Sequence, residues 1–222
     1  MKLPFLPYNL ARQPDRKHVR LLVAPDARTG EYWYENLKYW LGDPASLYWF
    51  SDWETLPYDQ YTPHPDLVAE RLRVLAELPT RTHGTVIASA AALRQRLCPQ
   101  THLDKYGIHL AIGDRLARDG LIQRLNDAGY QRSAHHISGK GEYAARGNIV
   151  DLYPMNAADP IRLEWFDDQI DSIRTFAVAD QRTLEKRDSI SILPRSELDL
   201  SDAGRTCYRQ NARLHYGEKI VD

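Results

Sequence analysis

The stretch VRLLVAPD (residues 19–26) decides the architecture of the first part of the chain. Five of its first six residues are apolar, two of these are β-branched, and Pro25-Asp26 closes the run. A short apolar run that ends in turn residues predicts a buried strand leading into a loop. Residues 19–24 are therefore predicted to be the first strand of a sheet.

Downstream of this strand, helical and strand patterns alternate up to about residue 100. The predicted elements are a helix stopped by Gly42-Asp43-Pro44, a strand over 46–50, a helix capped by Asp66, a strand over 85–88 and a short helix over 90–97. Regular alternation of strands and helices predicts a parallel sheet with helices on its faces. Residues 1–102 are therefore expected to form an α/β domain.

The pattern changes after residue 102. A strand is predicted over 110–112, a helix over 114–128 ended by Gly129, and further strands over 147–153, 162–166, 170–176 and 190–193. The residues between 166 and 170 predict a hairpin turn. We therefore expect residues 103–195 to form a smaller, mostly antiparallel α+β domain, and residues 196–222 to form a polar, helical tail.

Composition narrows the functional class. The 222 residues include 29 Lys and Arg against 30 Asp and Glu, a net charge of −1. This balance argues against a protein that works mainly by unspecific phosphate binding, although it leaves room for a local basic patch. Two cysteines fit a reducing compartment, and no uncharged apolar stretch approaches the roughly 18 residues of a membrane span. The sequence predicts a cytoplasmic protein without a membrane segment.

The sequence predicts no catalytic residue, no cofactor site and no metal site. Gly139-Lys140-Gly141 comes nearest to a phosphate-binding loop, but a glycine stands where the Mg²⁺-binding hydroxyl belongs. Residues 1–18, before the first strand, contain no glycine with which to build one. Cys-x-x-Cys and His-Glu-x-x-His patterns are absent, and Pro99 breaks the helix that would bring Cys98 and His102 to one face.

Aromatic residues mark a first candidate surface. Trp53, Tyr58 and Tyr61 lie in a proline-rich segment between a strand and a helix. They are expected either to fold onto the sheet or to stack on single-stranded bases. Acidic neighbours such as Asp52 and Glu54 would repel phosphates, so packing onto the sheet is favoured.

The hairpin strand over 162–166 is the better candidate surface. Alternation along a strand places Leu163 and Trp165 on one face, and Arg162, Glu164 and Phe166 on the other. An arginine and an aromatic residue on one outward face are typical anchors of protein–protein interfaces. The alternative is that Phe166 belongs to the core and Arg162 is an isolated surface charge.

Longer motifs carry a resemblance. In order along residues 18–200, the chain resembles the N-terminal region of the bacterial transcription-repair coupling factor family, Mfd. The matching motifs are Asp52-Trp53-Glu54-Thr55-Leu56-Pro57-Tyr58-Asp59, Thr62-Pro63-His64, Arg71-Leu72, the segments 141–147, 151–155 and 166–174, Gln181-Arg182 and Leu193-Pro194.

The resemblance implies the layout of the damage-recognition protein UvrB. Residues 1–102 would be domain 1a, a degenerate helicase-like α/β domain, and 103–195 would be domain 2, which binds UvrA. Residues 196–222 would be only the first part of domain 1b. The chain is therefore expected to be a fragment or a truncated relative. UvrB itself, a DNA-binding and damage-recognition protein, is the alternative, but it would carry a phosphate loop and an aromatic-rich hairpin.

The resemblance also implies a function in nucleotide excision repair. The module would be non-catalytic and would recruit UvrA to stalled transcription complexes, while RNA polymerase and DNA would be bound by C-terminal domains absent here. The family's UvrA-contacting residues fall on Arg146, Arg162 and Phe166. We expect the two arginines to pair with UvrA carboxylates, bidentately where geometry allows, and Phe166 to bury apolar area.

Overall fold

The computed structural model describes residues 6–12, 18–41, 46–55 and 62–217. The chain forms two compact units, Met1–Leu97 and Cys98–Asp222. The division falls a few residues before the boundary expected near residue 102. None of the described helices has the length and apolar character needed to cross a membrane.

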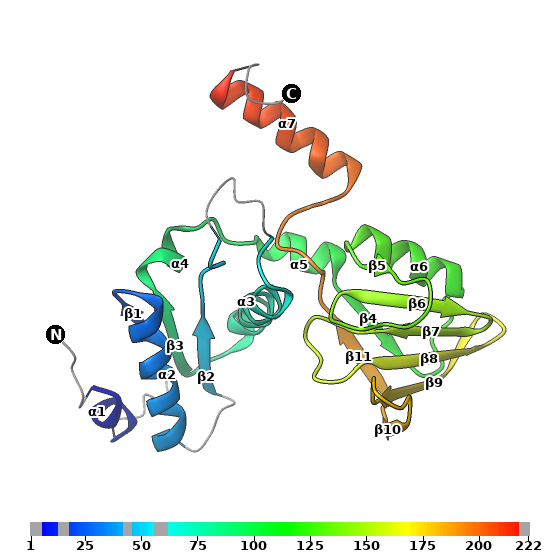
Figure 1. Cartoon of the computed structure of the whole chain (residues 1–222), viewed down its shortest axis with the longest axis horizontal. Coiled ribbons are helices and arrows are strands. Elements are labelled where there is room, and N and C mark those ends of the chain that lie inside the picture. The colour runs from blue at the N-terminus through cyan, green and yellow to red at the C-terminus, as the bar shows by residue number, and fades with distance from the viewer. Residues whose placement is uncertain (1–5, 13–17, 42–45, 56–61, 218–222) are drawn as a thin grey trace. The chain divides into compact units, whose positions relative to one another are not determined.

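The first unit is built on a three-stranded parallel sheet (Figure 1). Its strands are β1 (Val19–Ala24), β2 (Leu47–Phe50) and β3 (Gly84–Ser89), in the order β1-β3-β2. Its described helices are α1 (Leu6–Arg12), α2 (Ala27–Leu41), α3 (Pro65–Glu77), the 3-10 helix η2 (Leu78–Thr80) and α4 (Ala90–Arg94). The α/β architecture predicted for this region is confirmed.

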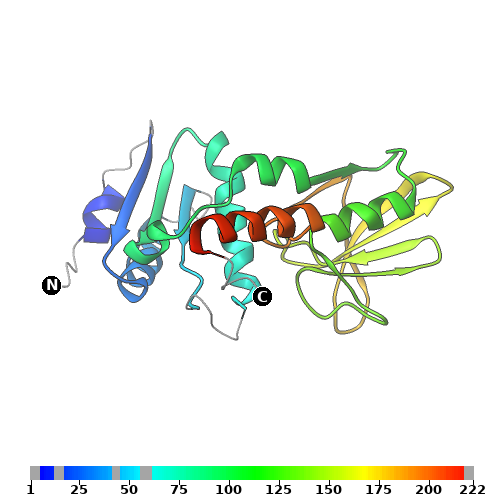
Figure 2. The same ribbon diagram turned by 90° about the horizontal axis from the view of Figure 1, so that it is seen from above.

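Helices cover both faces of this sheet. Leu47 and Tyr48 are neighbours in β2, so their side chains point to opposite faces. Leu47 belongs to a buried cluster with Leu37 of α2, and Tyr48 to another with Val74 of α3. The two helices therefore lie on opposite sides of the sheet (Figure 1 and Figure 2).

A buried arginine holds the segment after β2. Arg71 of α3 donates from Nη1 to the carbonyl oxygen of Ser51 at 2.6 Å and is fully buried. Its guanidinium carbon lies 4.3 Å from the centroid of the Phe50 ring and 5.3 Å from that of Trp53. Trp53 is thus packed against α3, while Tyr58 and Tyr61 lie outside the described residues.

Helix α3 starts differently from the prediction. The residue that caps it is His64, whose Nδ1 accepts a hydrogen bond from the Asp66 backbone N–H at 3.3 Å, and Pro65 occupies the first turn. Asp66 is therefore already inside the helix, where its negative charge favours the helix N-terminus. The prediction that Asp66 is the cap was wrong because Pro65 sets helical φ one residue earlier.

The second unit holds a six-stranded sheet and a two-stranded sheet (Figure 1). The first has the order β10-β9-β8-β7-β6-β5, and the second pairs β11 with β4. The strands are β4 (Ile108–Ala111), β5 (Gln131–Arg132), β6 (Glu142–Arg146), β7 (Ile149–Leu152), β8 (Ile161–Phe166), β9 (Gln169–Phe176), β10 (Thr183–Lys186) and β11 (Ser189–Ile192). The helices are α5 (Gln100–Tyr106), α6 (Arg118–Asp127) and α7 (Asp202–Tyr216). Every strand pair except β5–β6 is antiparallel, which confirms the predicted mostly antiparallel α+β region.

Helix α6 covers one face of the six-stranded sheet. Trp165 of β8 is buried and donates from Nε1 to the carbonyl oxygen of Leu116, just before α6, at 2.7 Å. Tyr143 of β6 donates from its hydroxyl to Asn126 Oδ1 in α6 at 2.8 Å. Because α6 takes this face, the opposite face of the sheet is the one that carries Arg162.

Helix α6 is shorter than predicted. It begins at Arg118 and not at Asp114. Asp114 is used in a turn, where its Oδ2 accepts from the Ala111 backbone N–H at 2.8 Å and its carbonyl oxygen accepts from the Ile170 N–H at 3.0 Å. These bonds tie the segment before α6 to the hairpin of β8 and β9.

Tyr130 joins three segments of the second unit. Its buried hydroxyl donates to the Leu193 carbonyl oxygen at 2.8 Å and accepts from the Met155 backbone N–H at 3.2 Å. Burial raises the pKa of this phenol, so the group stays neutral and keeps its proton for the bond to Leu193. We therefore expect the hydroxyl to contribute to stability beyond the apolar packing of the ring.

We predict that Tyr130→Phe lowers the free energy of unfolding by about 1–3 kcal/mol, because the buried Met155 N–H and the Leu193 carbonyl lose their hydrogen-bond partner. Urea denaturation followed by circular dichroism measures the change. Tyr208→Phe is the matched control, because Tyr208 is 74% exposed on α7, and it should leave the unfolding midpoint unchanged. Equal midpoints for the two variants would contradict this account.

The start of α7 is fixed by Asp199. Its Oδ1 accepts from the Ser201 hydroxyl at 2.6 Å and from the Tyr106 hydroxyl at 2.8 Å, and Lys105 Nζ lies 3.4 Å from Oδ2. Partial burial works to raise the pKa of Asp199, but these hydrogen bonds and the lysine outweigh it and lower the pKa to about 2.

A folded-state pKa below the unfolded value means that ionised Asp199 stabilises the native state. This contribution is fully present above the ordinary carboxyl pKa of about 4 and is lost as the pH falls through about 2. We predict that Asp199→Asn is less stable than the parent at pH 6 and that the difference shrinks between pH 4 and pH 2. Urea midpoints measured across this range test it, and a difference independent of pH would contradict it.

Candidate functional site

The candidate site lies on the face of the six-stranded sheet opposite α6. We call it the outer face and define it by Arg146, Asp151, Arg162, Glu164 and Phe166. Strand register carries these residues across β6, β7 and β8. The site is therefore formed by neighbouring strands whose order and register are fixed by backbone hydrogen bonds.

Alternation along β8 follows the prediction. Leu163 and Trp165 are buried, Arg162 and Glu164 are partly exposed, and Phe166 is 77% exposed. The alternative in which Phe166 belongs to the core is wrong. The face that the sequence predicted for Arg162 and Phe166 is the one turned away from α6.

Arg162 is held in one geometry. Its Nε donates to Asp151 Oδ1 at 2.7 Å and its Nη2 donates to Asp151 Oδ2 at 2.9 Å, a bidentate pair. Nη2 also donates to Gln181 Oε1 at 2.9 Å, and the guanidinium carbon lies 4.7 Å from the centroid of the Phe176 ring. The hydrogen bonds to Asp151 raise the pKa of Arg162, so the group is permanently charged.

Arg146 meets the same carboxylate. Its Nη2 lies 3.3 Å from Asp151 Oδ2, and 52% of its side chain is exposed. Two arginines that are distant in sequence are therefore brought together on one nearly buried acid. Asp151 was not predicted as a site residue, although an aspartate between Val150 and Leu152 in an apolar strand indicates that a charged partner is required.

Phe166 stands apart from the arginine pair. It ends β8, and four residues at about 3.3 Å of rise each separate it from Arg162. The turn that follows is anchored, because Gln169 Nε2 donates to the Gly113 carbonyl oxygen at 2.8 Å and the Leu116 N–H donates to the Asp168 carbonyl oxygen at 3.0 Å. The outer face therefore offers a charged cluster and, separate from it, an exposed aromatic ring next to an anchored turn.

The remaining charges of the outer face are paired with one another. Glu164 forms an ion pair with Arg174 of β9 and accepts a hydrogen bond from the Ser172 hydroxyl at 3.1 Å. Arg174 stands directly across from Arg162 in the register. Because Arg162 pairs with Asp151 and Arg174 pairs with Glu164, the repulsion between these two guanidinium groups is offset.

The internal pairing changes one expectation. Both Asp151 oxygens already accept from Arg162, so the Nε and Nη2 edge of its guanidinium is used within the chain. Among the described residues, no acceptor is recorded for the Nη1 atom of Arg162. Bidentate pairing of Arg162 with a partner carboxylate, expected from the sequence, would require either Asp151 or Gln181 to be displaced, because Nη2 donates to both, whereas a single bond to Nη1 would not.

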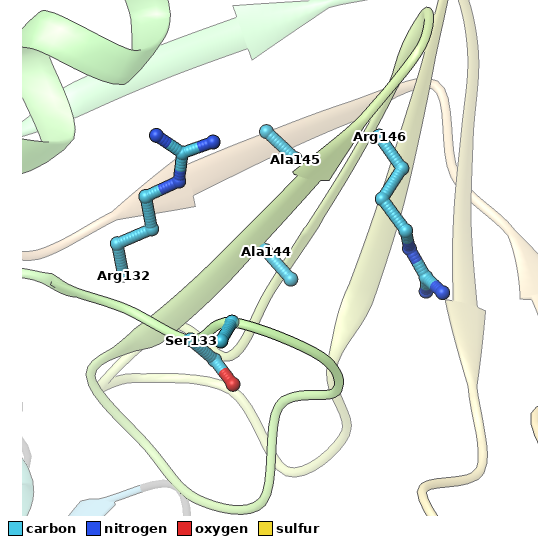
Figure 3. Close-up of a pocket in the computed structure, with 6 residues that line it drawn as sticks. Arg132, Ser133, Ala144, Ala145 and Arg146 are labelled. Atoms are coloured by element: carbon cyan, nitrogen blue, oxygen red, sulfur yellow. The ribbon is translucent and has the colours of Figure 1, made fainter.

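A hollow of about 340 Å³ opens at the edge of the sheet beside β6. Its lining residues are Arg132, Ser133, Ala134, Ala144, Ala145 and Arg146. Figure 3 shows the side chains of Arg132 and Arg146 on opposite sides of β6, so their guanidinium groups do not converge on one point. Of the five residues that define the outer face, Arg146 is the one that also lines the hollow.

No metal-binding cluster is found in the described part of the chain. Within residues 6–12, 18–41, 46–55 and 62–217, no group of three His, Cys, Asp or Glu side chains is placed so that it could hold an ion. The chemistry of the outer face is that of charge pairing and apolar contact.

We predict that Phe166→Ala changes the free energy of unfolding by less than about 0.5 kcal/mol, because the ring is largely exposed. Its neighbour Trp165 is the contrast, since Trp165→Ala should cost about 3–5 kcal/mol. Urea denaturation of the two variants checks the pair. A marked loss of stability in Phe166→Ala would show that the ring serves the fold and is not displayed for a partner.

Comparison of the amino-acid sequence with known proteins shows which family the chain resembles. A family model described as the UvrB interaction domain matches residues 108–198, which include every strand of the outer face. Transcription-repair-coupling factors of Escherichia coli K12 and Haemophilus influenzae Rd are 38% identical over 193 residues and 39% identical over 202 residues. These alignments cover 87% and 91% of this chain.

The corresponding protein of Bacillus subtilis 168 is 39% identical over 134 residues, which is 60% of this chain and 11% of that protein. The chain spans 17% of the length of the Escherichia coli and Haemophilus relatives. Over the residues it spans, the chain therefore belongs to the transcription-repair-coupling factor family, and residues 108–198 form its UvrB interaction domain.

Proposed function

We propose that this chain is a non-catalytic interaction module of transcription-coupled nucleotide excision repair, and that its outer face binds UvrA. Residues 1–102 would form the degenerate helicase-like domain 1a, 103–195 the UvrA-binding domain 2, and 196–222 the start of domain 1b. The similarity to transcription-repair-coupling factors supports the pathway. Recruitment of UvrA to stalled transcription complexes in the cytoplasm is the role that we infer for the module.

One observation carries the proposal. Arg146 and Arg162 converge on Asp151 on the same face that displays Phe166 at 77% exposure. A surface that only faces water would not require two arginines on one nearly buried carboxylate and an exposed aromatic ring further along the same strand. Arginine and aromatic side chains are the residue types that dominate protein–protein binding energy.

The chemistry of the outer face indicates what its partner presents. Two arginines share one carboxylate, so the cluster formed by Arg146, Arg162 and Asp151 carries a net positive charge. An acidic group on UvrA would complement it, and an apolar depression would receive Phe166. RNA polymerase and DNA would be engaged by other parts of a longer protein, as the resemblance implies.

The proposal is tested by calorimetric titration of UvrA with the parent chain and with the Arg162→Ala/Phe166→Ala double variant. We predict that the parent binds and that the double variant loses most of the affinity, because each hot-spot side chain contributes about 1–4 kcal/mol. The circular dichroism spectrum of the variant should match that of the parent.

The matched control is Arg209→Ala/Tyr208→Ala on α7, which also removes an arginine and an exposed aromatic residue. It should bind UvrA like the parent. Absence of binding by a folded parent chain would contradict the proposal. Binding of single-stranded DNA that weakens steeply with salt would instead favour a DNA-binding module that uses the aromatic residues of the segment from Trp53 to Tyr61.

A further inference from the structure

We propose that Asp151 is the positioning residue of the UvrA-binding face, holding Arg146 and Arg162 in the orientation that the partner meets. This inference rests on the proposed function. Asp151 itself would make no contact with UvrA, because only 4% of its side chain is exposed. Its effect on binding would pass entirely through the two arginines.

The geometry assigns this role to Asp151 and to no other acid on the face. Asp151 sits on β7, directly across from Arg162 of β8 in the register. It receives hydrogen bonds from Arg162 Nε at 2.7 Å, from Arg162 Nη2 at 2.9 Å and from Arg146 Nη2 at 3.3 Å. Glu164, the other acid of the outer face, is engaged by Arg174 and Ser172.

Burial makes the arrangement rigid. A carboxylate that is withdrawn from water is costly unless charged partners compensate, so Asp151 and the arginines are held to one another. Arginine side chains left free in solvent would sample many rotamers, and ordering them on binding costs free energy. Because Asp151 fixes the arginines when the chain folds, this rotamer entropy is already lost before the partner binds.

Gln181 supports the same orientation from the other side. Its Oε1 accepts from Arg162 Nη2 at 2.9 Å. Gln181 lies between β9 and β10 with a φ of 61°, in the left-handed region, and its backbone N–H donates to the Ala177 carbonyl oxygen at 2.9 Å. A strained backbone that is held by its own hydrogen bond places the amide oxygen beside the arginine.

The guanidinium N–H groups that are not engaged within the chain determine which atoms can bind the partner. With Nε and Nη2 of Arg162 engaged by Asp151 and Gln181, its Nη1 group is the one directed to an incoming acceptor. The half-exposed Arg146 supplies further donors beside it. The face is therefore suited to an acceptor that bridges two guanidinium groups end-on.

The direction in which Asp151→Asn changes the affinity for UvrA distinguishes a positioning role from an effect of net charge. Asp151→Asn removes a negative charge and makes the cluster more positive. If the net charge of the face governed attraction to an acidic partner, affinity would rise or stay the same. If Asp151 acts by orienting the arginines, affinity falls although the face has become more positive.

The experiment is a thermodynamic cycle of UvrA binding by calorimetry on the full chain. We expect Asp151→Asn to weaken binding about tenfold, and to change it less than about twofold in an Arg146→Ala/Arg162→Ala background, because the effect passes through the arginines. Gln181→Asn introduces a residue that tolerates positive φ and has a shorter side chain. It should weaken binding less than Asp151→Asn does, and the effect should disappear when Arg162 is replaced by alanine.

Asp171→Asn is the matched control, because Asp171 is exposed on β9 of the same sheet, and it should leave affinity unchanged. Thermal unfolding verifies that each variant folds, and if Asp151→Asn does not fold, the Gln181→Asn cycle decides the question. The inference is overturned if a folded Asp151→Asn variant binds UvrA as tightly as the parent or more tightly. The proposed function would still stand in that case, provided that Arg162→Ala weakens binding. Failure of the parent chain to bind UvrA would instead remove the proposed function.

Discussion

Strict alternation along β8 is the constraint on which the second unit depends. Trp165 and Leu163 are buried on the α6 side, so the residues between them must face the other way. A register shift by one residue would expose the tryptophan and bury Arg162 without its acid. The same packing that stabilises the domain therefore displays Arg162 and Phe166, and the outer face and the core lie on opposite sides of one strand.

The ion pair of Asp151 with Arg146 and Arg162 adds order to that display. Buried ion pairs contribute little net stability, because desolvation offsets much of the attraction. Here the ion pairs fix the orientation of the side chains, since Asp151 of β7 is paired with Arg146 of β6 and Arg162 of β8. A surface that is ordered before its partner arrives loses less conformational entropy on binding.

Much of the fold was predictable because hydrophobic patterning in this chain is local. The strands over 19–24 and 162–166 have clear apolar runs or alternation, and the structure has strands there. Strand β10 was not predicted, since all four of its residues are exposed and show no alternation. For the site, alternation found the face of Arg162 and Phe166, whereas the role of Asp151 depends on cross-strand register, which a single sequence does not specify.

The most direct test of the central claim asks which atoms of this chain touch UvrA. A photo-crosslinking benzoylphenylalanine placed at position 166, at the exposed end of β8, should form a covalent adduct with UvrA on illumination. The same amino acid at position 208 on α7 should form none. Crosslinking from position 208 and none from position 166, in a chain that binds UvrA, would show that the outer face of the six-stranded sheet is not the interface.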